Sequence, residues 1–118
     1  MEPYVLKPKL ILGLLGLTGA LLLSPMASAA DAEAAQALAK KEGCLKCHAI
    51  DKKKEAKSLK EISAKLKGKA NAEATILHHL TSGEKVKLDD GTEEEHKIIK
   101  SKDKAEISNL INWILSLK

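Results

Sequence analysis

Two cysteines and a histidine form the segment of this chain whose residue types and spacing point to chemistry. Cys44 and Cys47 are separated by two residues, and His48 follows directly. This C-x-x-C-H spacing is typical of covalent haem attachment, in which both sulfurs form thioethers with the porphyrin and the histidine ligates the iron. We therefore expect one haem c, attached through Cys44 and Cys47, with His48 as the proximal iron ligand.

Two other uses of the cysteine pair remain open at this stage. A dithiol redox pair needs the strand and helix of a parallel-sheet unit around it, and no β-rich strand precedes Cys44. A zinc site needs four ligands, and no second closely spaced pair of Cys or His completes the set. The residues favour haem attachment over both alternatives.

The first 29 residues are typical of an export signal. Two early lysines, a following apolar run and the small residues 27–29 fit such a signal, with cleavage expected after Ala29 or Ala30. The apolar run is shorter than the roughly 20 residues that a membrane-spanning helix needs. We therefore expect a soluble periplasmic protein formed by residues 30–118, attached to a membrane only if the signal is not cleaved.

The segment after residue 29 is small, and its composition is unusual for a domain that folds unaided. It holds 18 lysines and no arginine against 15 acidic residues, and Trp113 is its only aromatic residue. A bound haem would supply the large apolar surface that such a core lacks, so we expect little stable tertiary structure without it. The lack of arginine clusters and stacking aromatic residues argues against nucleic-acid binding. The lysines indicate either an ordinary solvated surface or steering toward redox partner proteins with an acidic docking surface.

Four helices are expected, with strand content near zero. Glycines at 43, 68 and 83 end the first three. Asn71 is a good N-cap for the third helix, and Asp103 with Glu106 can form a capping box for the fourth. The expected helices span residues 31–42, 58–67, 71–82 and from Ser101 or Asp103 to the C-terminus.

The helical periodicity also predicts the core. We expect the buried positions to be Ala35, Leu38, Ala39, Leu59, Ile62, Leu66, Ile76, Leu77, Leu80, Ile107, Leu110, Ile111, Ile114 and Leu117, with Trp113 on the flank of the last helix. Residues 84–100 lack this periodicity and contain Asp90-Gly91, which indicates a long loop with a short extended piece at 86–88.

The chain resembles the class I c-type cytochromes over nearly all of residues 30–118. The attachment motif follows an N-terminal helix directly, and the chain closes with a helix that contains Asn112-Trp113-Ile114-Leu115. The resemblance implies an all-α fold of about four helices around one haem, with the first and last helices in close contact, and electron transfer as the function. In the family a Gly-Pro pair offers a carbonyl to the proximal histidine. Here Ala56 and Lys57 occupy those positions, so a carbonyl remains but the stiffness of proline is lost.

The usual distal ligand of that family, a methionine before the last helix, has no counterpart here. The only methionines are Met1 and Met26. His96 stands close to the family's methionine position and is the favoured distal ligand; His79 is the alternative, with His78 and an open or water-bound iron after it. Residues 93–95 are glutamates, which form either a solvated turn or a hydrogen-bond acceptor for His96.

These residues predict a bis-histidine electron carrier with a lowered reduction potential, because methionine is the ligand that raises it. A redox or gas sensor whose distal histidine detaches on reduction is the alternative. A haem peroxidase is less favoured, because nothing fixes a candidate acid-base group, Glu95 or His79, at the distal side. We expect the protein not to be an enzyme.

Overall fold

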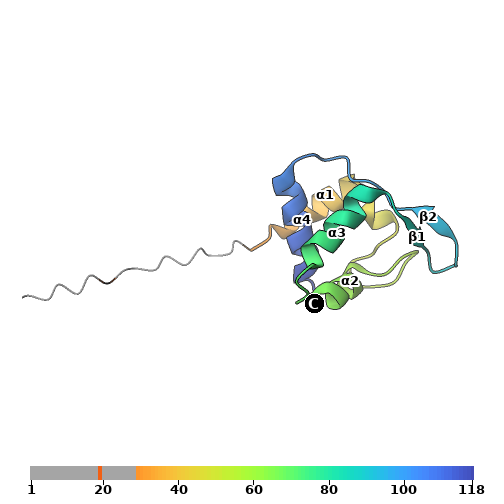
Figure 1. Ribbon diagram of the computed structural model, residues 1–118, viewed down its shortest axis with the longest axis horizontal. Coiled ribbons are helices and arrows are strands. Elements are labelled where there is room, and N and C mark those ends of the chain that lie inside the picture. Colours follow the sequence, from red (N-terminus) through yellow and green to blue (C-terminus); the bar gives the residue numbers. More distant parts are fainter. Residues whose placement is uncertain (1–18, 20–28) are drawn as a thin grey trace, which may run out of the picture.

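Four α-helices and one short hairpin make up the part of the chain that the computed structural model describes, which is residue 19 and residues 29–118 (Figure 1). The expected export signal lies almost wholly outside these residues. In chain order the elements are α1 (Ala32–Lys41), the short 3-10 helix η1 (Cys44–Lys46), α2 (Leu59–Leu66), α3 (Ala72–Ser82), β1 (Lys85–Lys87), β2 (Glu93–Glu95) and α4 (Lys104–Ser116). The predicted all-α fold class with four helices is confirmed.

Side-chain caps explain where three of the helices begin. Asp31 accepts a hydrogen bond from the Ala34 amide at the start of α1, and Ser58 forms a reciprocal capping box with Glu61 at the start of α2. Asp103 caps α4, but Glu106 accepts a bond from the Ser101 hydroxyl instead of closing the predicted box.

The start of α3 differs from the prediction. Asn71 precedes this helix, yet its side chain makes no capping hydrogen bond. Its carbonyl instead accepts from the amide and the hydroxyl of Thr75. The expected helix start is therefore right in position, but the expected side-chain cap is wrong.

Helices α1 and α4 pack against each other (Figure 1). Asn109, in the middle of α4, binds the start of α1: its side chain accepts from the Asp31 amide at 2.8 Å and donates to the Asp31 carbonyl at 2.9 Å. Ala35 and Ala39 of α1 are almost fully buried, which allows close contact between the two helices. Most of the predicted core is confirmed, and the buried hydrophobic residues are Ala35, Leu38, Ala39, Leu59, Ala72, Ile76, Leu80, Ile99, Leu110, Ile111, Trp113 and Ile114.

Four of the predicted core residues are only partly buried against this core: Ile62, Leu66, Ile107 and Leu117. Two further positions differ from the prediction. Leu77 was expected to be buried but is 43% exposed, because the apolar face of α3 is narrow and only Ala72, Ile76 and Leu80 reach the interior. Trp113 was expected on the flank of α4 but is 4% exposed. The single tryptophan is therefore part of the core, where its large apolar area contributes most.

Residues 84–100, which were predicted as a loop, contain an antiparallel hairpin. Strand β1 pairs with β2 in the register Lys85↔Glu95, Val86↔Glu94 and Lys87↔Glu93. Opposite charges therefore face each other across both outer pairs, an arrangement that stabilises a pair of exposed strands. The predicted turn at Asp90-Gly91 lies between the strands, and Asp90 accepts bonds from the amide and hydroxyl of Thr92.

The segment after the hairpin is held by buried contacts. The Ile99 amide donates to the Leu80 carbonyl at 2.8 Å, and Ile99 is 4% exposed. The carboxylate of Glu42, at the end of α1, accepts bonds from the amides of Lys100 and Ser101 at 2.8 and 3.2 Å. This segment is therefore tied to α3 and to α1 before α4 begins.

We expect Glu42→Ala to destabilise the haem-loaded protein by about 2 kcal/mol. The amides of Lys100 and Ser101, which follow the buried Ile99, would lose their charged hydrogen-bond acceptor. Urea unfolding followed by circular dichroism measures this change. Glu33→Ala, which removes an exposed carboxylate from the same helix, is the matched control and should change the stability by less than about 0.5 kcal/mol. Equal effects of the two variants would contradict this role of Glu42.

No helix among the described residues is both long enough and apolar enough to cross a membrane.

Candidate functional site

The attachment motif lies at the turn that ends α1. Gly43 adopts a left-handed conformation with φ of 80°, and η1 begins at the next residue, Cys44. The His48 amide donates to the Cys44 carbonyl at 3.0 Å, which closes one helical turn around the motif. A Cβ atom at position 43 would lie 3.0 Å from Lys97 Nζ. Glycine therefore permits the turn, while the end of the flexible Lys97 side chain occupies the space beside it.

His48 is oriented by a main-chain carbonyl. Its Nδ1 lies 2.6 Å from the Lys57 carbonyl oxygen. Because a carbonyl can only accept, Nδ1 carries the proton and Nε2 keeps a free lone pair. The predicted replacement of the family's proline carbonyl by that of Lys57 fits this contact.

Main-chain hydrogen bonds brace the loop that presents this carbonyl. The Ala56 amide donates to the Cys47 carbonyl at 3.1 Å, and the Leu59 amide donates to the Ala49 carbonyl at 2.9 Å. These bonds compensate in part for the stiffness that proline would have given the loop.

His96 lies opposite His48. The centres of the two imidazole rings are 6.4 Å apart, with an angle of 49° between the planes. His96 Nδ1 lies 3.1 Å from the Lys97 carbonyl oxygen, so its Nε2 is also left with a free lone pair. Burial lowers the pKa of His96, and the nearby His48 and His79 lower it further. Neutral imidazole, the form that binds metal ions, is therefore favoured.

Of the two alternatives for residues 93–95, a solvated segment or a hydrogen-bond acceptor for His96, the structure favours the solvated one. Residues 93–95 form β2, and all three side chains are exposed. The Lys97 carbonyl, not a carboxylate, is the hydrogen-bond partner of the His96 ring.

The spacing of the two rings fits one iron between them. A metal ion lies about 2 Å from a ligating imidazole nitrogen, and each ring centre lies roughly 1 Å beyond its nitrogen, so two rings on one ion have centres about 6 Å apart. No group of three or more Cys, His, Asp or Glu side chains in the described part of the chain is placed to hold a metal ion. Two imidazoles from the protein suit an iron whose other four ligands belong to a porphyrin.

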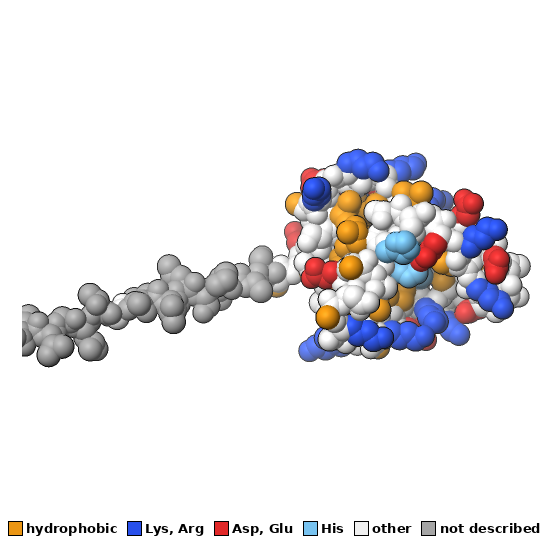
Figure 2. Space-filling view, viewed as in Figure 1, with side chains coloured by type: hydrophobic (Ala, Val, Ile, Leu, Met, Phe, Trp, Pro, Cys, Tyr) orange, Lys and Arg blue, Asp and Glu red, His pale blue; other side chains and the backbone are white. Residues whose placement is uncertain are grey.

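The other two histidines lie at the end of α3. The ring of His79 is 5.9 Å from that of His96, and the ring of His78 is 6.4 Å from that of His79. Both bind the Glu84 carboxylate, through His79 Nδ1 and His78 Nε2. The side chain of His78 is 64% exposed, as expected for a surface histidine. Figure 2 shows histidine side chains together in the middle of one face.

The cysteines lack the properties of a redox-active dithiol. Burial raises the pKa of Cys44, and burial together with the Glu55 carboxylate raises that of Cys47, whose Sγ lies 3.5 Å from Glu55 Oε2. A reactive thiol requires a lowered pKa. The described residues also contain no parallel sheet, so the structure does not favour the dithiol alternative.

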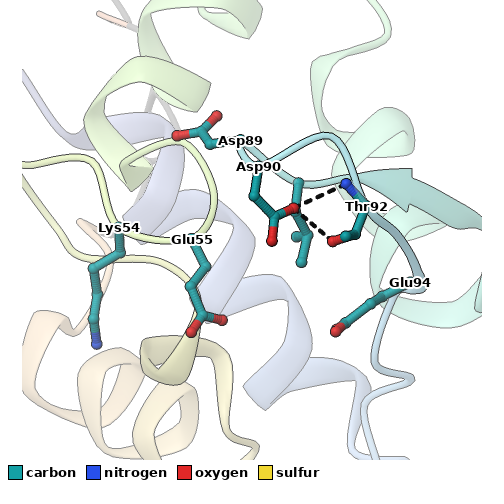
Figure 3. Close-up of a pocket in the computed structure, with 7 residues that line it drawn as sticks. Lys54, Glu55, Asp89, Asp90, Thr92 and Glu94 are labelled. Atoms are coloured by element: carbon teal, nitrogen blue, oxygen red, sulfur yellow. Dashed lines mark hydrogen bonds between the residues drawn. The ribbon is translucent and has the colours of Figure 1, made fainter.

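A cavity of about 300 Å³ opens beside the attachment loop but does not suit the haem (Figure 3). Its walls are charged side chains from the loop and from the hairpin turn, and neither the cysteines nor the histidines line it. A porphyrin needs an apolar pocket next to the iron ligands. The lining residues are Lys54, Glu55, Leu88, Asp89, Asp90, Thr92 and Glu94.

The sequence did not predict the contacts of two carboxylates near the site. Glu42 fixes the segment after His96, and Glu84 binds two histidines. Neither residue belongs to a motif. The Lys100 partner of Glu42 is 58 residues away in sequence, and the histidine partners of Glu84 are five and six residues away. A carboxylate five or six residues after a histidine, just beyond the end of a helix, is common in protein sequences. This spacing alone therefore does not predict that Glu84 binds the two histidines.

Comparison with known proteins gives consistent matches. The protein-family model of cytochrome c matches residues 32–118. Cytochrome c-551 of Pseudomonas aeruginosa is 41% identical over 78 residues, which cover 66% of this chain and 70% of that protein. Cytochrome c-551 of Stutzerimonas stutzeri is 33% identical over 117 residues, which cover 93% of this chain and 98% of that protein.

Two solved structures share the fold. The class 1 cytochrome MtoD of Sideroxydans lithotrophicus ES-1 is 52% identical, with a TM-score of 0.72, and the match covers 75% of this chain and 98% of that one. Cytochrome c552 of Nitrosomonas europaea is 29% identical, with a TM-score of 0.57 and coverage of 70% and 99%. The chain therefore belongs to the cytochrome c family, as a small class I c-type cytochrome that carries covalently attached haem c and serves in electron transfer.

Proposed function

We propose that this cytochrome is a periplasmic electron carrier whose single haem is attached through Cys44 and Cys47 and ligated by His48 and His96. The 6.4 Å spacing of the two imidazole rings is the main support. The described residues contain no methionine, so thioether ligation from within this part of the chain has no candidate. The bound haem supplies one-electron chemistry at its iron.

The protein's own residues suit a carrier that changes little on electron transfer. The Lys57 carbonyl orients His48, and the Lys97 carbonyl orients His96. The His96 amide also donates to the Glu84 carbonyl at 2.8 Å, and Ile99 is bonded to α3. Main-chain bonds on both sides of His96 support its retention in both oxidation states, which favours a carrier over a sensor that releases its ligand.

Ligation by His96 predicts a reduction potential below that of a methionine-ligated form of the same protein. His96→Met should therefore raise the potential by a clear fraction of the roughly 0.8 V over which axial ligands move haem potentials. A spectroelectrochemical titration measures both proteins, and a methionine charge-transfer band checks ligation in the variant. A variant that shows this band without a rise in potential would contradict the proposal.

The proposed partner presents an acidic surface to a lysine-rich face formed by residues 52–69. This segment holds eight lysines and two glutamates, a net charge of +6, whereas the rest of residues 30–118 holds ten lysines and 13 acidic residues. All eight lysines are exposed, and only Lys53 has a carboxylate partner within 4 Å, Asp89 at 3.6 Å. Figure 2 shows lysines along the lower edge of the molecule, over α2.

Two lysines of this face lie unusually close together. The side chain of Lys57 lowers the pKa of Lys65, because the two cationic groups approach each other. An anionic surface placed against them would relieve this repulsion. The pair is therefore a suitable target for a charge reversal.

We expect the double variant Lys57→Glu/Lys65→Glu to slow electron transfer from an acidic protein about tenfold at low ionic strength, because steering by the lysine-rich face is reversed. Stopped-flow reduction by flavodoxin, used as an acidic model partner, measures the rate. Lys102→Glu/Lys104→Glu is the control, because it makes the same change of charge at the start of α4. The lysine-rich face adjoins the end of α4, and the two ends of this helix are roughly 20 Å apart. Equal effects of the two double variants would contradict docking at this face.

A further inference from the structure

Two imidazoles are candidates for the distal position of the haem. The His96 ring is the neighbour of both His48, at 6.4 Å, and His79, at 5.9 Å. The side chain of His79 is 45% exposed and lies on the last turn of α3. Both candidates carry the same imidazole ring, so the contacts around each ring must determine which of them ligates the iron.

Glu84 contacts both candidates, in two different ways. Its Oε1 accepts a hydrogen bond from His79 Nδ1 at 2.5 Å, and its Oε2 lies 3.2 Å from His78 Nε2. Its main-chain carbonyl accepts the His96 amide at 2.8 Å. The carboxylate therefore holds the ring of His79, while the backbone of the same residue holds the backbone of His96.

The turn before Glu84 makes this double contact possible. Gly83 has a left-handed backbone with φ of 64°, which ends α3 and reverses the chain. A Cβ atom at this position would lie 3.1 Å from Ile98 Cδ1. Glycine therefore lets the segment 96–98 approach the end of α3, and Glu84 follows at the point where the two meet.

We infer that Glu84 is the positioning residue that selects the distal ligand, retaining His79 at the end of α3 and leaving His96 to the iron. This inference rests on the proposed ligation by His96. A charge-assisted hydrogen bond is stronger than a neutral one, so His79 must lose a strong contact before its ring can move toward the haem. His96 loses no hydrogen bond to the Glu84 carboxylate when it ligates the iron, because its amide binds the main-chain carbonyl of Glu84.

Three variants of the haem-loaded protein test this role through the ferric spin state, measured by electron paramagnetic resonance and absorption. His96→Ala alone is expected to be high-spin, because Glu84 still holds His79. In His96→Ala/Glu84→Ala the low-spin fraction should rise roughly tenfold, since a charge-assisted bond no longer restrains His79. Adding His79→Ala should return the protein to high spin.

The matched control is His96→Ala/Glu73→Ala, which removes an exposed carboxylate from the first turn of α3. It should remain as high-spin as His96→Ala. Glu84 is partly exposed, and circular dichroism checks that each variant folds. In His96→Ala/Glu84→Gln, the amide keeps one acceptor for His79, so its low-spin fraction should lie between those of His96→Ala and His96→Ala/Glu84→Ala.

The outcomes separate this inference from the proposed function. If His96→Ala is high-spin and removal of the Glu84 carboxylate leaves it so, Glu84 does not select the ligand, although His96 ligation stands. If low spin persists after His79 is also removed, another residue supplies the ligand, and selection against His79 is refuted. If His96→Ala alone keeps the wild-type spectrum, His96→Ala/His79→Ala separates two cases. High spin in this double variant means that His79 replaces His96 and that Glu84 does not restrain it, whereas an unchanged spectrum means that His96 is not the ligand and both proposals fail.

Discussion

His96→Ala is expected to convert the ferric haem from low spin to predominantly high spin. The substitution removes the imidazole whose ring centre lies 6.4 Å from that of His48, and no methionine among the described residues can replace it. Water, a weaker ligand, is then the available occupant of the sixth site. Electron paramagnetic resonance of the ferric protein measures this change, and binding of carbon monoxide to the reduced variant provides an independent test.

His78→Ala is the matched control for this experiment. Its imidazole is 64% exposed and binds Glu84 rather than facing His48. The control should keep the low-spin spectrum of the wild type, and its reduced form should not bind carbon monoxide. A high-spin His78→Ala together with a low-spin His96→Ala would contradict the proposed assignment of the ligands.

Cys44→Ala/Cys47→Ala is expected to abolish covalent haem attachment and most of the stability of the domain. The domain has one aromatic side chain in its core, Trp113, and otherwise relies on leucine, isoleucine and alanine. Loss of a tightly bound macrocycle should remove most of the roughly 5–15 kcal/mol that stabilises a native domain. Thermal unfolding followed by circular dichroism should then show no cooperative transition.

The single variant Cys47→Ala separates attachment from packing. It keeps one possible thioether, at Cys44, and keeps His48, so haem can still bind and support folding. We expect a cooperative transition at a lower temperature than in the wild type. A haem-free double variant that unfolds cooperatively at the wild-type temperature would show that the polypeptide core suffices on its own.

The helices could be predicted because local signals and packing agree. Ala35 and Ala39 combine high helix propensity with a spacing that places both on one face, and both are buried. Gly43 and Gly83 end their helices in the left-handed conformation that glycine favours. The attachment motif was predictable for a different reason, since its three reactive side chains are local in sequence.

The differences arise where long-range contacts decide the structure. The hairpin pairs Lys-Val-Lys with Glu-Glu-Glu, which has no apolar alternation to reveal it; charge complementarity between the strands was the available signal. Leu77 is exposed where burial was predicted, and Trp113 is buried where a position on the flank of the helix was predicted. Helical periodicity identifies the apolar face of a helix, but it does not identify the neighbouring elements that cover this face. The Glu42 carboxylate binds amides 58 and 59 residues away, a contact that no local pattern encodes.

The most direct test of the account is a high-resolution crystal structure of the ferric, haem-loaded protein. The account predicts that His48 Nε2 and His96 Nε2 both lie about 2 Å from the iron, on opposite sides of the porphyrin. It also predicts that His79 remains bound to Glu84. A sixth site occupied by His79 or by water, with the His96 ring turned to solvent, would contradict it.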